Sequence, residues 1–395
     1  MRNASEQKPS ALPAPGGRTS PVTEIRWEEA GDQRSALWRS ESGWAPPRRV
    51  VIADDKLTAD VAYRLAKSGA GILWHGDFLG ARQLLQALAR RVDRGRRPAD
   101  TDLTAAFRRS RREALTRAQL LNLVLVPLEA DYTVPLRRAP DVRDACTETY
   151  GPADGPSVTS LRELIGVIGA HEWRTKGVPV PALGDRIHPH YGVFSPIRGE
   201  YLELVLSAPL PSDSVAFDIG VGTGVLSAIL ARRGVKHVVG TDQDPRALAC
   251  ARDNIKRLGL TGQVEIARAD LFPPGRADLV VCNPPWIPAA ASTSTDFAVY
   301  DPDSRMLRGF LAGLAEHLEP DGEGWLIISD IAELLGLRSR GELLDFIEAG
   351  GLEVVDRLDT RPTHRRASDG SDPLHAARAA EVTSLWRLRA RRTGA

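Results

Sequence analysis

The fold of this chain is decided by residues 214–224, SVAFDIGVGTG, where an apolar run ends in a carboxylate and three alternating glycines. The run has the length and composition of a buried strand, and residues 224–234, GVLSAILARRG, continue as a helix. Glycines at such a junction permit a tight turn and leave peptide N–H groups open to a ligand, because no Cβ obstructs them. The stretch therefore predicts the first strand, loop and helix of a ligand-binding α/β sheet.

Downstream of this stretch, short β-rich runs alternate with helical ones, which is typical of a doubly wound parallel sheet. Six further strands are expected after the first, which gives a seven-stranded Rossmann-like sheet, at residues 237–242, 264–270, 277–283, 324–330, 352–360 and 381–389. Helices are expected between them at residues 245–259, 304–318 and 340–350.

Acidic residues follow the first three strands at the places where such sheets bind ligands. Asp218 precedes the glycines and places a carboxylate near a ligand amine. Asp242 ends the second strand, where an acid can accept both hydroxyls of a ribose, and Asp270 ends the third, within reach of an adenine amino group. Together they indicate a nucleoside with a cationic amino-acid tail, although a dinucleotide such as NAD is the alternative for the glycine turn alone.

The fourth strand ends in the sequence Asn283-Pro284-Pro285-Trp286, at the carboxyl edge where open α/β sheets hold their chemistry. Two prolines stiffen the strand tip, so the Asn283 side chain and the Pro284 carbonyl keep fixed directions. Both oxygens can accept N–H bonds from one planar NH2 group and aim its nitrogen at an electrophile. Trp286 offers a flat face for the amide, base or guanidinium that carries the nitrogen. The alternative to a catalytic role is a purely structural Pro-Pro turn that ends the strand.

With these motifs in order, residues 187–395 resemble class I S-adenosylmethionine-dependent methyltransferases. The resemblance implies S-adenosylmethionine as cofactor, bound by Asp218, Gly220, Gly222, Thr223, Gly224, Asp242, Asp270, Leu271 and Asn283. It also implies that Asn283, Pro284, Pro285 and Trp286 form the catalytic motif, which in this family marks methylation of nitrogens in planar groups. Glutamine-specific members usually have Tyr where this chain has Trp286, which leaves the substrate open.

Residues 188–205 resemble the segment that precedes the sheet in protein-glutamine N5-methyltransferases, where it closes over the cofactor. Our candidates for a substrate-side lid are Phe194, Pro196, Arg198 and Glu200. His188 and His190 are expected to face the pocket as loop residues, because no second ligand cluster accompanies them and no metal is expected.

Two more segments should open on the same edge of the sheet. Asp330 follows the fifth strand as a candidate substrate contact, with a helix N-cap as the equal alternative. If the last two strands pair antiparallel, their long polar connection, residues 360–381, also falls there and brings His364 to the site. Loops of that length are more often functional than spacers.

The part of the chain before the sheet predicts two segments. Residues 1–47, rich in Pro and Gly, are expected to be a disordered lead-in, and residues 48–185 a mainly helical accessory domain that recognises substrate. The methyltransferase domain then occupies residues 186–395. Residues 90–117 carry ten Arg against four acids, which suits RNA contact. Solvated helix faces in an Arg-biased chain are the more economical interpretation, since only six of 52 basic residues are Lys.

Composition limits the remaining possibilities. A net charge of +1 in 395 residues argues against a charge-driven nucleic-acid clamp, and the sequence lacks a long uncharged apolar run. Three scattered cysteines and no export signal suit the cytoplasm. We expect a small amino-acid-like or natural-product substrate, with a protein glutamine or an RNA base as the macromolecular alternative. The non-enzymatic alternative is a degenerate scaffold that only binds the cofactor. The sequence leaves the oligomeric state open.

Overall fold

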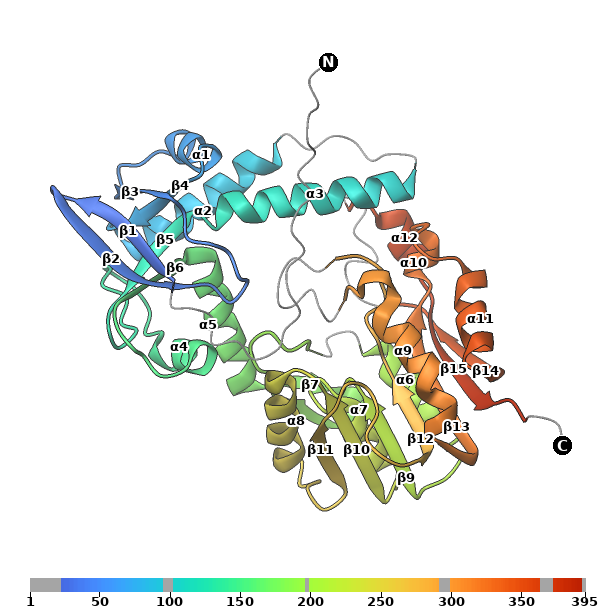
Figure 1. Ribbon diagram of the computed structural model, residues 1–395. Helices are drawn as coiled ribbons and strands as arrows, with labels where there is room; N and C mark the ends of the chain where they lie inside the picture. The colour runs from blue at the N-terminus through green and yellow to red at the C-terminus, as the bar shows by residue number, and fades with distance from the viewer. Residues whose placement is uncertain (1–22, 95–101, 196–198, 291–298, 363–371, 393–395) are drawn as a thin grey trace.

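The computed structural model describes residues 23–94, 102–195, 199–290, 299–362 and 372–392 (Figure 1). Two α/β units follow one another along the chain, each built on its own sheet. A two-stranded ribbon, β7 (Val178–Val180) and β8 (Asp185–Ile187), lies between them in the sequence. Among the described residues, no helix combines the length and hydropathy needed to cross a membrane.

The C-terminal sheet has the order β11-β10-β9-β12-β13-β15-β14. Its strands are β9 (Val215–Ile219), β10 (His237–Asp242), β11 (Val264–Arg268), β12 (Ala277–Cys282), β13 (Leu318–Ser329), β14 (Leu352–Thr360) and β15 (Thr383–Ala390). The first five run parallel, and β15 inserts antiparallel between β13 and β14. Ser329 therefore pairs with Thr383, which puts the connection from β14 to β15 at the carboxyl edge, as expected.

Helices cover both faces of this sheet and complete its two cores. They are α6 (Glu200–Ser207), α7 (Val225–Arg232), α8 (Pro245–Arg257), α9 (Arg305–Leu314), α10 (Ile331–Leu334), α11 (Arg340–Ala349) and α12 (His375–Ala380). Leu202 of α6 and Ile229 of α7 share one apolar cluster on the first face, while Phe310 of α9 and Ile347 of α11 share another on the second. The predicted Rossmann-like α/β fold is confirmed.

The N-terminal unit differs from the mainly helical domain predicted from the sequence. It holds a six-stranded sheet of order β1-β2-β6-β5-β4-β3. The strands are β1 (Glu24–Glu29), β2 (Asp32–Arg39), β3 (Arg49–Ala53), β4 (Ala70–Trp74), β5 (Val124–Leu128) and β6 (Ser157–Ser160). The mainly helical prediction is wrong because runs such as β5 are short and almost fully buried, so they carry no period-two signal.

Within the part of the chain that the structure describes, five helices accompany that sheet. They are α1 (Ala59–Lys67), α2 (Phe78–Asp93), α3 (Leu103–Leu121), α4 (Arg143–Tyr150) and α5 (Leu161–Lys176). Side chains of Thr58, Asp77 and Asp102 cap the first turns of α1, α2 and α3 by accepting backbone N–H bonds. The N-terminal unit is therefore an α/β layer rather than a helix bundle.

The prediction of disorder over residues 1–47 is wrong for the part that the structure describes. Residues 24–39 form the β1–β2 hairpin, whose Ile25 is buried with Leu73 and Val158 in one cluster. Trp38 donates from Nε1 to the Trp44 carbonyl and so ties the following Pro-rich segment to the sheet. Residues 1–22 lie outside the described part of the chain.

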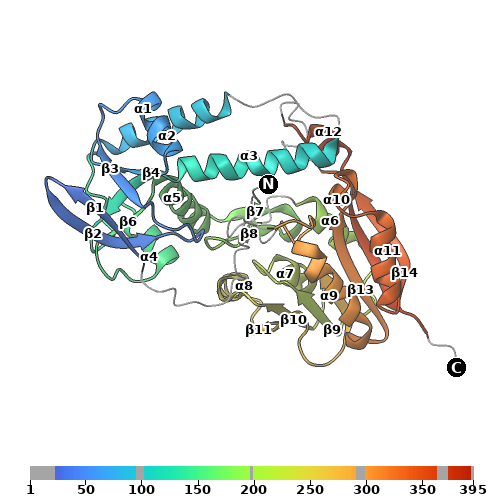
Figure 2. The same ribbon diagram turned by 45° about the horizontal axis from the view of Figure 1, so that its top comes forward.

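Helix α3 links the two units. Both ribbon views show it running from beside α2 to the neighbourhood of α10 and α12 (Figures 1 and 2). Its C-terminal residues Ala118 and Leu121 are buried in the N-terminal unit. Its N-terminal residues Ala106 and Phe107 are buried in an apolar cluster with Ile331 and Leu335 of the C-terminal unit.

Candidate active site

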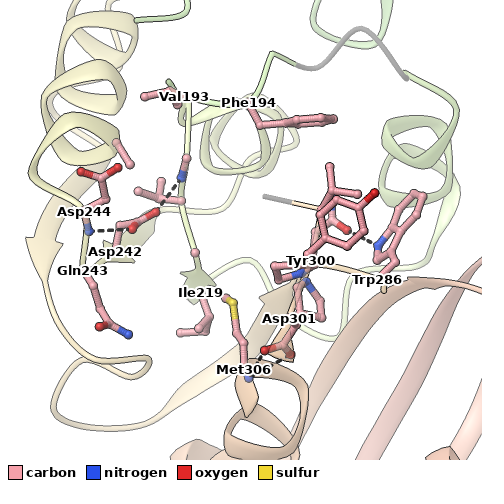
Figure 3. Close-up of a pocket in the computed structure, with 18 of the residues that line it drawn as sticks. Val193, Phe194, Ile219, Asp242, Gln243, Asp244, Trp286, Tyr300, Asp301 and Met306 are labelled. Carbon is pink, nitrogen blue, oxygen red and sulfur yellow. Dashed lines mark hydrogen bonds between the residues drawn. The ribbon is translucent and has the colours of Figure 1, made fainter. Parts of the chain in front are cut away.

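A cavity of about 970 Å³ lies at the carboxyl edge of the C-terminal sheet. Residues after β9, β10, β11 and β12 line it, as does the first turn of α9. Figure 3 shows Asp242 and Asp244 on one side of the space and Phe194, Tyr300 and Trp286 on the other. One half is thus acidic and the other aromatic.

The glycine loop forms the floor of the acidic half. Gly220 and Gly222 line the cavity with φ values of 78° and 52°, a region that other residues rarely adopt. The N–H groups of Gly220 and Val221 both donate to the Thr241 carbonyl, which holds the loop over β10. A Cβ on Gly220 would approach Met306 Cε to 2.7 Å, so the loop and α9 are in contact there.

Two of the residues predicted to bind cofactor do not reach the cavity wall. Gly224 lies against α8, where an added Cβ would stand 3.3 Å from the Ala251 Cα, so it serves close helix packing. Asp218 is fully buried beneath the loop, and its Oδ2 accepts bonds from the backbone N and Oγ of Ser227 at 2.9 and 2.6 Å. Burial raises the pKa of Asp218 to about 6. Asp218 therefore fixes the start of α7 instead of facing a ligand.

The other predicted cofactor residues do line the cavity. Asp242 accepts the Gly222 N–H on one carboxylate oxygen and the Asp244 N–H on the other. Burial raises its pKa from the ordinary value. Asp270 accepts a bond from the Gln243 side chain, and the remaining wall residues of this half include Thr223 and Leu271.

The sequence Asn283 to Trp286 lines the aromatic half directly after β12, as predicted. Trp286 Nε1 donates to Asn283 Oδ1 over 2.9 Å, so the side-chain oxygen of Asn283 is oriented by the indole. A carboxamide oxygen has two lone pairs, which leaves one for a substrate N–H. Pro284 is buried, so its position is held by packing on both sides.

The residues predicted on the substrate side are only partly brought together. Phe194 lines the cavity with 37% of its surface exposed, whereas Glu200 does not line it and its neighbour Tyr201 does. Asp330 stays outside the wall because its Oδ1 accepts the Val382 N–H and joins β13 to β15. Pro196, Arg198 and His364 lie outside the described residues.

The two histidines predicted to face the pocket do not line it: His188 lies between the units, and His190 bonds within the C-terminal unit. His188 Nδ1 bonds the Arg174 carbonyl of α5, and its backbone N–H donates to Asn254 of α8. His190 Nε2 bonds Asp253 of α8. Within the described ranges, no group of three or more His, Cys, Asp or Glu side chains is arranged to hold a metal ion.

Sequence reasoning missed several residues of the wall. Tyr300 and Asp301 line the aromatic half, and Asp301 caps α9 by accepting the N–H groups of Met306 and Leu307. Arg378 and Glu381 reach the same half from the end of the β14–β15 connection. The only sequence signal for Tyr300 and Asp301 is their place just before α9, in a connection that must return over the carboxyl edge.

Comparison with known proteins relates the C-terminal unit to methyltransferases. Residues 185–335 match the model of the methyltransferase small domain. A release factor glutamine methyltransferase of Cereibacter sphaeroides is 30% identical over 191 residues, which are 45% of this chain and 63% of that protein. One of Mycolicibacterium smegmatis is 36% identical over 180 residues, 43% of this chain and 55% of the relative.

A ribosomal protein L11 methyltransferase of Pelotomaculum thermopropionicum is 34% identical over 143 residues, 36% of this chain and 39% of that protein. The chain thus spans less than two thirds of the length of each of these three relatives. The match falls on the C-terminal unit and leaves the N-terminal sheet outside it. Through residues 185–335, the chain carries a methyltransferase domain of the class I, S-adenosylmethionine-dependent kind, as its motifs predict.

Proposed function

We propose that this protein is an S-adenosylmethionine-dependent N-methyltransferase that modifies the side-chain amide of a glutamine in a protein substrate. The observation that carries the proposal is the orientation of Asn283 by Trp286 beside the glycine loop in one cavity. The names of the relatives, which specify glutamine in a release factor, favour a protein over the small molecule expected from the sequence.

The acidic half of the cavity suits the cofactor. Gly220 and Gly222 offer backbone at the cavity floor, and Asp242 keeps carboxylate lone pairs for ribose hydroxyls beside the N–H bonds that it accepts from Gly222 and Asp244. Asp270 and Leu271 would face the adenine. When bound there, the cofactor supplies an electrophilic methyl group on a sulfonium.

The chemistry asked of this chain is the positioning of a weak nucleophile. One N–H of the substrate amide donates to Asn283 Oδ1 and the other to the Pro284 carbonyl, so the nitrogen is held in one direction. These two bonds would favour the nitrogen lone pair leaving conjugation, so that it can accept the methyl group that a bound cofactor would supply. The nitrogen then loses one proton to solvent, so no strong general base is needed. Trp286 and Phe194 provide flat apolar faces beside the amide.

We also propose residues 48–185 as the substrate-recognition domain, with residues 186–395 catalytic. The support is that α3 packs on Ile331 and Leu335 of the C-terminal unit and that Arg174 of α5 pairs with Asp253 of α8. The β1–β2 hairpin belongs to the same sheet, so the folded recognition unit begins before residue 48.

The test is label transfer. The full chain is incubated with methyl-labelled S-adenosylmethionine in three separate reactions, one each with a desalted protein, RNA or small-molecule fraction. We expect label in protein, released as methylamine on acid hydrolysis because the modified group is an amide. Asn283→Ala should bind cofactor normally and lose roughly 100-fold in transfer, the scale of one positioned polar contact at a reacting centre. Label confined to small molecules or to RNA would refute the glutamine assignment, and RNA label would indicate an exocyclic base amine.

A further inference from the structure

Helix α3 belongs to the N-terminal unit, yet one of its side chains lies against the wall of the proposed active site. The Arg111 guanidinium stacks over the Tyr300 ring, with its carbon 3.9 Å from the ring centroid. The same guanidinium donates to the Ala290 carbonyl over 2.7 Å. Arg111 therefore holds both described ends of the segment that separates Trp286 from α9.

Tyr300 is in turn joined to the strand tip that carries the catalytic motif. It forms a β-bridge with Ile287, and hydrogen bonds run from the Ile287 N–H to the Val299 carbonyl and from the Asp301 N–H to the Ile287 carbonyl. Ile287 directly follows Trp286, whose indole orients Asn283. A displacement of Tyr300 would thus move Ile287 through the bridge, and Ile287 is covalently bonded to Trp286.

The remainder of α3 is fixed independently of Arg111. At 19 residues and 1.5 Å per residue the helix is about 28 Å long, enough to span both units. Thr104 Oγ1 donates to the Leu335 carbonyl over 2.7 Å at one end, and Arg117 pairs with Asp93 at the other. Arg111 therefore lies on a helix that is fixed at both ends, so its side chain can hold Tyr300 in one position.

We infer that Arg111 is a positioning residue for the substrate half of the active site: it holds Tyr300, and with it the tip after Trp286, from the other domain. The inference rests on the proposed function for its effect on transfer. It assigns to the N-terminal unit a part in building the pocket, so the substrate half is complete only when the two units are docked. The cofactor half is built from the loops after β9, β10 and β11, whereas Arg111 contacts the segment after β12.

Hydrogen–deuterium exchange of the full chain tests this without any acceptor. Arg111→Ala should speed exchange in peptides from residues 283–290 and 299–304 by roughly tenfold, as expected when a stacked cation and its hydrogen bond are lost. Peptides over 219–232 should be unchanged, and S-adenosylmethionine should bind with unchanged affinity. Arg112→Ala, an exposed neighbour on the same helix, is the matched control and should behave as wild type.

Variants of the partner ring sharpen the test. Tyr300→Phe keeps the stacked face and should resemble wild type, whereas Tyr300→Leu should reproduce Arg111→Ala. In the transfer assay, Arg111→Ala should raise KM for the protein acceptor roughly tenfold with a smaller change in kcat, since the pocket wall and not the reacting contact is altered. Arg111→Lys, which lacks the planar guanidinium, should recover less than half of the loss.

Two results would overturn the inference. One is unchanged exchange over 283–290 and 299–304 in Arg111→Ala. The other is faster exchange that extends to residues 331–337, the separate contact of α3, because that would report undocking of the helix. A wild-type enzyme that binds cofactor but labels no protein would refute the proposed function alone, since the exchange result is obtained without an acceptor.

Discussion

Asp218 makes the stability of the C-terminal domain depend on pH in a direction opposite to that of most carboxylates. Burial raises its pKa from 3.8 to about 6 in the folded protein, although Ser227 donates two hydrogen bonds to it. Between these values the folded state binds the proton and the unfolded state releases it. Stability from this group is therefore fully present below pH 4 and is lost as pH rises through 6.

The size of the effect follows from the same two values. At about 1.4 kcal/mol per pKa unit, a rise from 3.8 to about 6 corresponds to about 3 kcal/mol in all, and roughly 2 kcal/mol of this is lost between pH 4 and pH 7. Asp218→Asn removes the titrating group, so the stability of wild type relative to this variant should fall by that amount across the interval. The comparison cancels groups that do not interact with Asp218, such as Asp301, whose pKa burial also raises.

The assay is urea unfolding at half-unit steps from pH 4 to pH 7, followed by the NMR signal of a 13C-labelled Met306 methyl. The chain has two methionines, and Met306 is the one inside the C-terminal domain, so its signal reports that domain by itself. Ser227→Ala removes the 2.6 Å hydroxyl bond and should steepen the loss by raising the pKa of Asp218 further. Parallel curves for wild type and Asp218→Asn would refute the reasoning.

Two further predictions concern the loop and the motif. Gly220→Ala should destabilise the domain by about 1–2 kcal/mol in urea unfolding, because a φ of 78° is strained for alanine. Adding Met306→Ala relieves the 2.7 Å contact and should restore only a minor part of this stability. Full recovery in the double variant would contradict the backbone explanation. Trp286→Phe keeps a stacking face but loses the hydrogen-bond donor to Asn283, so label transfer should fall roughly tenfold. Cofactor affinity, measured by calorimetry, should be unchanged. Transfer at the wild-type rate would show that the indole does not orient Asn283.

The C-terminal half of the fold follows from the sequence because its signals are local. Strands such as residues 237–242 and 352–360 coincide with β10 and β14, since each apolar run is bounded by turn residues and alternates with a helix of clear period. The cofactor wall after β10 and β11 followed from the same topology. The motif did not predict which way its residues face. Asp218 is buried below the loop and bonds Ser227, and Gly224 lies against α8.

The N-terminal half was harder because β6 is short and fully buried, and β5 follows the end of α3 with one nearly continuous apolar run across both elements. The part of the site made by tertiary contact was also invisible. Nothing local in the sequence associates Arg111 with Tyr300, which lie 189 positions apart by number and meet only because α3 crosses between the units. Contacts of this kind depend on domain docking, which periodicity and motif spacing do not encode.

The central claim is that the acidic half of the cavity binds S-adenosylmethionine, and calorimetric titration of the full chain with that molecule tests it most directly. We predict one binding event per chain for wild type and an affinity weakened roughly tenfold or more in Asp242→Ala, because hydrogen bonds to a carboxylate are each worth about 1.5–3 kcal/mol. Asn283→Ala should titrate like wild type. Absence of binding by the wild-type protein, or binding that Asp242→Ala leaves unchanged, would contradict the account.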